Sequence, residues 1–123
     1  YRQPFYFLSQ YRNIPWLRSF MKDPVMQIHP DTAAKYGIED GDWAYIESPR
    51  GRIKQRARCF PGIHPGVVMA TANCFYPEDP PPLHGLTKSN PNVLTSNDHC
   101  DPMYGSPDLT ALICRVSKAP EDD

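Results

Sequence analysis

Short apolar runs separated by proline, glycine and polar residues make up most of this chain, and no apolar period of 3.6 residues persists beyond a few turns. This pattern predicts a strand-rich domain with irregular connections. Strands are expected over residues 4–8, 25–28, 43–47 and 67–71, the last of them continuous in apolar character and therefore fully buried. A final long strand is expected over residues 109–116. The fold class indicated is all-β or β-dominated.

Residues 52–60 alternate between an apolar or uncharged face and a basic face. The first face carries Ile53, Gln55, Ala57 and Cys59, and the second carries Arg52, Lys54, Arg56 and Arg58. Strict alternation is typical of a half-buried strand. With the turn sequence Ser48-Pro49-Arg50-Gly51 before it, the segment predicts a hairpin whose basic face is solvated.

A helix of little more than one turn is expected over residues 32–36. Asp31 is the expected N-cap and Gly37 the expected stop. The pair Asp40-Gly41 then supplies a tight turn with a positive φ.

Proline distribution and chain length suggest how the rest is organised. Residues 77–91 contain Pro80-Pro81-Pro82 and further turn residues, which predicts a long loop, and order is expected to return at 92–96. The acidic tail at 119–123 is expected to fray. With 123 residues, the chain is expected to be a single domain, 1–123, excised from a larger protein.

The charge balance and the cysteine spacing narrow the function classes. The net charge of −1 gives no general attraction to nucleic acid, and no apolar run is long enough to span a membrane. The four cysteines form no C-x-x-C pair and are expected to be ordinary reduced thiols. His99-Cys100-Asp101 would point to opposite sides of an extended segment, and Gly105-Ser106-Pro107 is a common turn rather than a self-processing serine. No nucleophile–base arrangement is recognisable.

Two polar clusters are candidates for ligand binding. The first follows the strand at 4–8 and combines guanidinium, amide, aromatic and hydroxyl groups, which suit a phosphorylated, nucleotide-like ligand. Its members are Gln10, Tyr11, Arg12, Asn13, Trp16, Arg18 and Ser19. The second, at 89–96, contains Asn92, and an amide can donate and accept at a pterin or guanine edge. By composition alone, a solvated loop is the simpler interpretation of the first cluster and a turn that of the second.

A set of motifs, each common by itself, occurs in order along nearly the whole chain. They are Phe7-Leu8-Ser9-Gln10-Tyr11-Arg12, Pro30-Asp31-Thr32-Ala33, Gly37-Ile38-Glu39-Asp40-Gly41-Asp42, Ser48-Pro49-Arg50-Gly51, Pro65-Gly66-Val67-Val68 and Asn92-Val93-Leu94-Thr95. In this order they resemble the C-terminal molybdopterin-dinucleotide-binding domain of the dimethyl-sulfoxide-reductase (molybdopterin oxidoreductase) family. Asp42-Trp43, His64-Pro65 and Cys100-Asp101-Pro102 resemble its acetylene hydratase and transhydroxylase-like branch most.

The resemblance implies a six-stranded double-psi β-barrel with short capping helices and long proline-rich loops. In the family, this domain covers bis(molybdopterin guanine dinucleotide), with molybdenum or tungsten, in an oxidoreductase catalytic subunit. The cofactor contacts that it implies here are Gln10, Tyr11, Arg12, Arg18, Ser19, Asn73 and Asn92. The metal is held by the pterin and by a ligand elsewhere in the enzyme, so neither catalytic residues nor metal ligands are expected in this chain, which alone should have no turnover.

Implied partners are the remaining domains of the same catalytic subunit and an iron–sulfur electron-transfer subunit, with no nucleic acid and no direct membrane contact. The parent reaction, which in this family includes hydratases and hydroxytransferases, the choice of metal, and location in the cytoplasm or cell envelope of a bacterium or archaeon are not determined by these residues. Two alternatives stay open: a double-psi-barrel module for protein interaction or substrate recognition, and a small self-contained enzyme. One departure matters, because many members have Thr-Gly-Arg where this chain has Gln10-Tyr11-Arg12, and the glycine that permits close backbone approach is missing.

Overall fold

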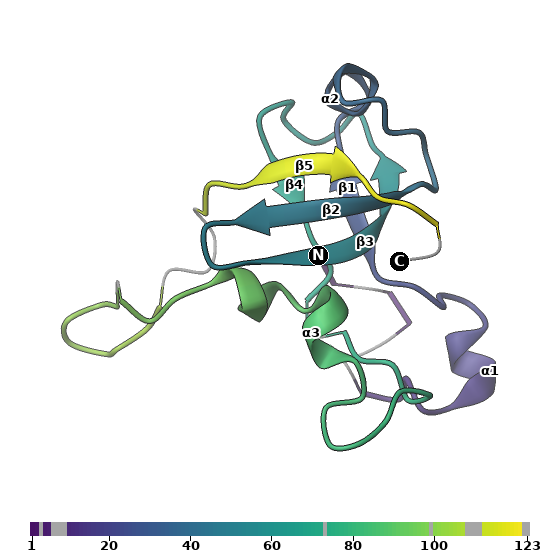
Figure 1. Ribbon diagram of the computed structural model, residues 1–123, viewed down its shortest axis with the longest axis vertical. Helices are drawn as coiled ribbons and strands as arrows, with labels where there is room; N and C mark the ends of the chain where they lie inside the picture. Colours follow the sequence, from purple (N-terminus) through teal and green to yellow (C-terminus); the bar gives the residue numbers. More distant parts are fainter. Residues whose placement is uncertain (3, 6–9, 73, 99, 108–111, 122–123) are drawn as a thin grey trace.

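A single sheet forms the centre of the molecule (Figure 1). The computed structural model describes residues 1–123 except 3, 6–9, 73, 99, 108–111 and 122–123. Within the described residues the strands are β1 (Val25–Ile28), β2 (Trp43–Ser48), β3 (Gly51–Cys59), β4 (Val68–Met69) and β5 (Arg115–Lys118). The helices are α1 (Pro15–Arg18), α2 (Pro30–Lys35), α3 (Leu86–Ser89) and the 3-10 helix η1 (Pro91–Leu94). The prediction of a mainly β fold with few short helices is confirmed.

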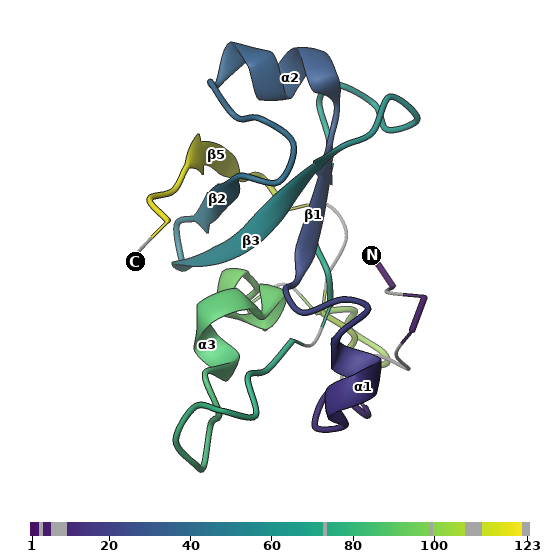
Figure 2. The same cartoon turned by 90° about the vertical axis from the view of Figure 1, so that its right-hand side faces the viewer.

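The sheet has the order β4-β1-β3-β2-β5 and curls around its longest strand, β3 (Figure 2). β3 pairs antiparallel with β2 and parallel with β1. The parallel pairing needs a crossover, which α2 and β2 supply between the two strands. In both views α2 lies at one end of the sheet, whereas α1 and α3 lie at the other (Figures 1 and 2).

The predicted alternation along the β2–β3 hairpin is confirmed. Ile53, Gln55 and Ala57 are buried, whereas Arg52 and Arg58 are exposed. Gln55 is fully buried and satisfies its amide with backbone groups, donating to the carbonyl oxygens of Thr71 at 3.0 Å and Ser89 at 2.8 Å. Its Oε1 accepts from the Thr71 amide at 2.9 Å. Because buried polar groups must be paired, this side chain fixes β3 to α3 and to the segment after β4.

The hydrophobic core lies on the inner face of the sheet and under α2. It consists of Met26, Ile28, Ala33, Ile38, Ala44, Ile46, Ile53, Ala57, Leu94 and Val116. Four strands, α2, the turn after it and η1 therefore share one cluster, and the alternating apolar positions of the sequence are the ones that reach it.

The start of α2 differs from the prediction. The helix begins at Pro30, and its N-cap is His29, whose Nδ1 accepts from the Asp31 amide at 3.2 Å. Proline favours the first helical position because its missing N–H is not needed there, so the cap falls one residue before it. The expected positive φ is confirmed at Gly41 (90°), and Gly37, the expected stop of the helix, also has a positive φ (65°).

The strand predicted over 67–71 is wrong in length and in burial. Only Val68–Met69 pairs, and Val67 and Met69 are 47% and 44% exposed. The segment has the apolar composition of a buried strand, but it lies at the edge of the sheet, where composition does not decide burial.

Other predicted segments are only partly described. The strand predicted at 4–8 lies mostly outside the described residues, and Pro4 and Phe5 are in a turn. The predicted loop at 77–91 contains α3, and the order expected to return at 92–96 is present as η1, which ends at Leu94. The last strand begins at Arg115, after 108–111, which lie outside the described residues. Within the described part of the chain, no helix is long and apolar enough to cross a bilayer.

The C-terminal tail contacts the sheet as far as Glu121. The Ala119 amide donates to the Trp43 carbonyl at 2.8 Å, and Glu121 pairs with Arg56 at 3.0 Å. Residues 122 and 123 lie outside the described residues.

Candidate functional site

A pocket of about 710 Å³ lies beside α1, at the end of the sheet away from α2. Its lining is Arg12, Asn13, Pro15, Arg18, Ser19, Lys22, Pro77 and Glu78. Three residues that the sequence assigned to a cofactor site, Arg12, Arg18 and Ser19, therefore meet in one cavity. The pocket joins the segment before β1 to the segment after β4, which are more than 50 residues apart in the sequence.

Arg12 forms the buried wall of this pocket. Only 1% of its surface is exposed. Its Nε donates to the Phe75 carbonyl at 2.9 Å, its Nη2 donates to the Lys22 carbonyl at 3.0 Å, and its guanidinium lies 6.0 Å from the centre of the Tyr76 ring. Arg12 therefore ties three separate segments together, and its planar fork suits two carbonyls in fixed directions.

Tyr11 precedes this arginine in a left-handed backbone conformation, with φ 68°. It occupies the position where the related motif Thr-Gly-Arg has glycine, the residue that adopts this conformation without steric cost. The bend that glycine would allow is therefore present, although the glycine is not. Tyr11 is 54% exposed. Gln10, beside it, is also exposed.

Arg18 closes the rim of the pocket through a bidentate ion pair with Glu78. Nη2 of Arg18 lies 2.6 Å from Oε1 of Glu78, and Nη1 contacts the other carboxylate oxygen. The hydrogen bonds from Arg18 lower the pKa of Glu78 to about 2, whereas burial acts in the opposite direction. The guanidinium of Arg18, which has the geometry to bind a phosphate, therefore already binds the carboxylate of Glu78.

Two further lining residues carry polar groups toward this cavity. Lys22 and Asn13 form no side-chain hydrogen bond or ion pair with any residue that the structure describes. Sequence reasoning missed Lys22, which lies between two predicted elements, and Glu78, which lies in the predicted proline-rich loop. Asn13 belonged to the first polar cluster. Ser19 Oγ donates to the Trp16 carbonyl at 2.7 Å, so its hydroxyl caps the end of α1 as well as lining the pocket.

The second predicted cluster does not line this pocket. Asn92 lies in η1 and is exposed, and its backbone N–H donates to Oδ1 of Asn90 at 3.0 Å. Asn90 is the buried N-cap of η1. Asn73 lies outside the described residues.

Metal ligands and thiols are the other groups that could carry chemistry in the described part of the chain. Among those residues no group of three or more His, Cys, Asp or Glu could hold a metal ion. The four cysteines are free thiols, and burial raises the pKa of the Cys74 thiol. The pocket by α1, with three cations against one carboxylate, is suited to bind an anion rather than a metal.

Comparison with known protein families gives one match that covers most of the chain. Residues 1–113 match the family model described as "Molydopterin dinucleotide binding domain". The chain is 37% identical over 118 residues to the dopamine dehydroxylase of Eggerthella lenta, a match that covers 96% of this chain and 12% of that protein. It is 30% identical over 110 residues to the acetylene hydratase of Syntrophotalea acetylenica, covering 84% of this chain and 15% of that protein.

A solved structure is similar over nearly the whole chain. The acetylene hydratase from Pelobacter acetylenicus superposes with a TM-score of 0.89 at 27% identity, covering 97% of this chain and 17% of that one. The resemblance to the acetylene hydratase branch is thereby confirmed in sequence and in structure. The chain spans about an eighth of the length of the first of these curated relatives.

Proposed function

This chain belongs to the molybdopterin dinucleotide-binding domain family, and from that premise we propose that the pocket beside α1 holds a phosphate-bearing part of the cofactor. Domains of this family bind the dinucleotide in catalytic subunits of molybdenum and tungsten oxidoreductases. The bound cofactor supplies the metal and its redox chemistry, and this chain supplies binding and orientation.

The observation that carries the proposal is the gathering of Arg18, Lys22 and Ser19 around one cavity. An arginine guanidinium matches two phosphate oxygens, and a lysine ammonium adds a point charge. The Ser19 hydroxyl, whose one donor bonds the Trp16 carbonyl here, would turn from that carbonyl to donate to the ligand. The side chains of Lys22 and Asn13 have no competing partner among the described residues. The lining therefore fits an anionic group, and the fit favours cofactor binding over a protein-interaction module.

We assign different roles to the residues of the first loop. Arg12 is a positioning residue, because its guanidinium is buried and bonded to two backbone carbonyls. Arg18 and Ser19 are proposed phosphate contacts, and the exposed Gln10 and Tyr11 are proposed contacts to a ring or edge of the ligand. For Asn92 and Asn73 the support remains the family resemblance.

The finer architecture and context are part of the same proposal. We propose that residues 1–123 form one domain and that the curled sheet belongs to a six-stranded double-psi barrel, which the crossover between β1 and β3 and the similarity to acetylene hydratase support. The expected partners are the remaining domains of a molybdenum or tungsten catalytic subunit and an iron–sulfur subunit. The share of its relatives that the chain covers supports the first of these.

The test uses the complete enzyme and two substitutions at the pocket. Arg18→Ala and Lys22→Ala should each weaken cofactor retention about ten- to a hundredfold, since a charge-assisted hydrogen bond contributes about 1.5–3 kcal/mol. Retention is measured as pterin fluorescence after oxidation, normalised to protein. Retention equal to that of the unsubstituted enzyme in both variants would place the ligand elsewhere.

The matched control is Arg58→Ala. Arg56, which the alternation placed on the same solvated face, is unsuitable because it pairs with Asp23 at 3.5 Å and Glu121 at 3.0 Å and lies 4.2 Å from the Trp43 ring centre. Arg58 is exposed and has no ion pair with any residue in the described ranges. Its substitution should leave the pterin content unchanged.

A further inference from the structure

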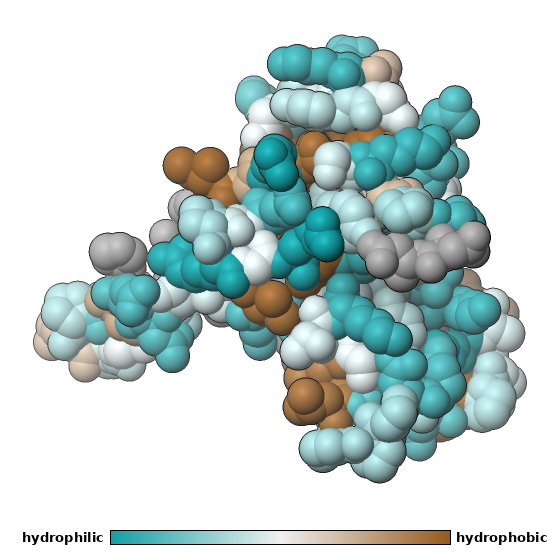
Figure 3. Space-filling model, in the orientation of Figure 1, coloured by the Kyte–Doolittle hydropathy of each residue, from teal (hydrophilic) through white to brown (hydrophobic). Residues whose placement is uncertain are grey.

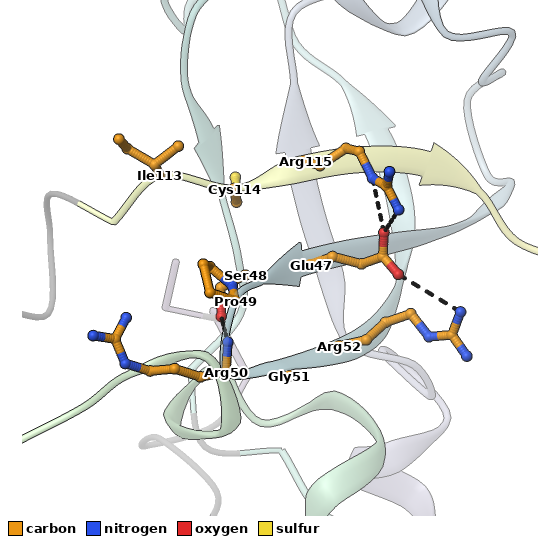
Figure 4. A pocket seen from close by; sticks show the side chains of 9 residues that line it. All are labelled: Glu47, Ser48, Pro49, Arg50, Gly51, Arg52, Ile113, Cys114 and Arg115. Carbon is orange, nitrogen blue, oxygen red and sulfur yellow. Dashed lines mark hydrogen bonds and ion pairs between the residues drawn. The ribbon is translucent and has the colours of Figure 1, made fainter.

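A second groove, of about 580 Å³, lies beside the β2–β3 turn, on the other side of the molecule from α1 (Figures 1 and 4). Its lining is Glu47, Ser48, Pro49, Arg50, Gly51, Arg52, Ile113, Cys114 and Arg115. It contains three arginines and one carboxylate, although the whole chain has a net charge of −1. Positive charge is therefore concentrated here.

Two of the arginines converge on the same carboxylate from opposite strands (Figure 4). Glu47 stands opposite Arg52 of β3 and Arg115 of β5 in the sheet register. Nε and Nη2 of Arg115 donate to Oε2 of Glu47 at 3.0 and 2.6 Å, whereas Nη1 of Arg52 is 3.6 Å from Oε1, beyond a normal hydrogen bond. One carboxylate thus serves two guanidiniums, and most donors of Arg52 remain available.

The other end of the groove carries a third cation and an apolar side chain. Arg50 and Ile113 both point away from the Glu47 cluster (Figure 4). Arg50 has no side-chain partner among the residues with described positions, and Ile113 is 90% exposed. A single small oxyanion could meet only one end of the groove, whereas an extended ligand with separated negative charges could meet both.

We propose that this groove docks an acidic, partly apolar segment of the same catalytic subunit, outside residues 1–123. The inference rests on the proposed function, which makes the chain one domain of such a subunit. Charge complementarity selects the acidic side chains. Arginine is enriched in protein interfaces relative to the rest of the surface, and the exposed Ile113 side chain would gain from being covered there. Within one polypeptide the effective concentration of such a segment is high, so a small groove suffices.

Hydrophilic surface covers most of the face shown in Figure 3, with a few apolar patches among it. Nucleic acid is disfavoured as the ligand of this groove, because its binding requires many more phosphate contacts and the chain has no net positive charge. The acidic segment should instead form a few charge-assisted hydrogen bonds with Arg50, Arg52 and Arg115.

The test is zero-length cross-linking in the complete enzyme that carries Arg50→Lys. The lysine keeps the charge and offers an amine that carbodiimide joins to a contacting carboxylate. Peptide mapping should give a cross-link from position 50 to an Asp or Glu outside residues 1–123 of the same polypeptide, and the same treatment of an Arg58→Lys control should give none. No cross-link, or one only to another subunit, would overturn the proposal.

A second measurement does not depend on the cross-linking reaction. Amide hydrogen exchange at residues 48–52 should be at least tenfold faster in Arg50→Glu than in the unsubstituted enzyme, and unchanged in Arg58→Glu. Equal exchange in Arg50→Glu would count against a docked segment. Pterin content is measured on the same samples: a pterin-free unsubstituted enzyme refutes the proposed function, whereas normal pterin with no cross-link refutes only the docking.

Discussion

Replacing Arg12 with alanine should destabilise the fold itself. The side chain is 1% exposed and donates to the carbonyls of Phe75 and Lys22. Alanine removes both bonds and leaves two acceptors without their partner in a crowded interior. The loss of cofactor expected in such a variant would then follow from loss of structure rather than from loss of a ligand contact.

The magnitude follows from these two bonds. Each carbonyl left without its donor costs about 1–3 kcal/mol, and loss of the packed aliphatic stem of Arg12 adds to this cost. Part of the loss is offset, because the variant no longer has to bury a charged guanidinium. The expected net loss is about 2–5 kcal/mol, which is large against the roughly 5–15 kcal/mol by which an ordinary domain is stable. Arg12→Lys should recover only part of it, since an ammonium on a flexible stem cannot reproduce the planar fork.

The assay is urea unfolding of the 123-residue chain followed by tryptophan fluorescence and circular dichroism. The midpoint should fall in Arg12→Ala with the slope unchanged, whereas Arg58→Ala should stay within about 0.5 kcal/mol of the unsubstituted chain. A change of less than about 1 kcal/mol in Arg12→Ala would refute the view that this arginine holds the loops together.

Three further outcomes are expected from the same assay. Tyr11→Gly should be more stable than Tyr11→Ala by about 1 kcal/mol, because φ is 68° at this position and glycine adopts that conformation without steric cost. Both variants lose the ring, so the comparison isolates the backbone, and the reverse order would show that the backbone at Tyr11 is not strained. Gly51→Ala should lower the free energy of unfolding by about 1–3 kcal/mol, since the added Cβ would stand 2.8 Å from Cγ1 and 3.0 Å from the carbonyl oxygen of Val93. An unshifted midpoint would show that Val93 moves aside at no cost. Because Arg18 lowers the pKa of Glu78 from 4.5 to about 2, the pair should stabilise the fold above about pH 4.5 and lose this effect as the pH falls through 2. Stability should thus fall less over that range in Glu78→Gln, and identical pH profiles would exclude the pair as a contributor.

Local patterns predicted the parts of the fold that local chemistry decides. The alternation from residue 52 onward and the turn at 48–51 located β3 and its hairpin, because one face of a strand must be buried and the turn fixes the register. The extent of β4 could not be predicted, since a short apolar run at a sheet edge pairs only as far as its neighbour β1 allows. The sequence predicted only that order returns at 92–96 and not that it takes the form of η1, because the side-chain bond by which Asn90 caps this helix is not specified by composition.

The two arginines of the first loop show why the sequence could locate the candidate site but could not assign a role to each of its residues. Arg12 and Arg18 are identical in type and only six residues apart, and the same phosphate-binding argument applied to both. Their environments differ because of residues more than 50 positions later: the Phe75 carbonyl draws Arg12 inward, and the Glu78 carboxylate holds Arg18 at the rim. A buried arginine bonded to carbonyls stabilises a site, whereas an arginine paired with an exposed carboxylate can exchange it for a phosphate. The residue types therefore predicted that the cluster could bind an anion. Which arginine supports the fold and which contacts the ligand is decided by long-range packing, which residue types do not show.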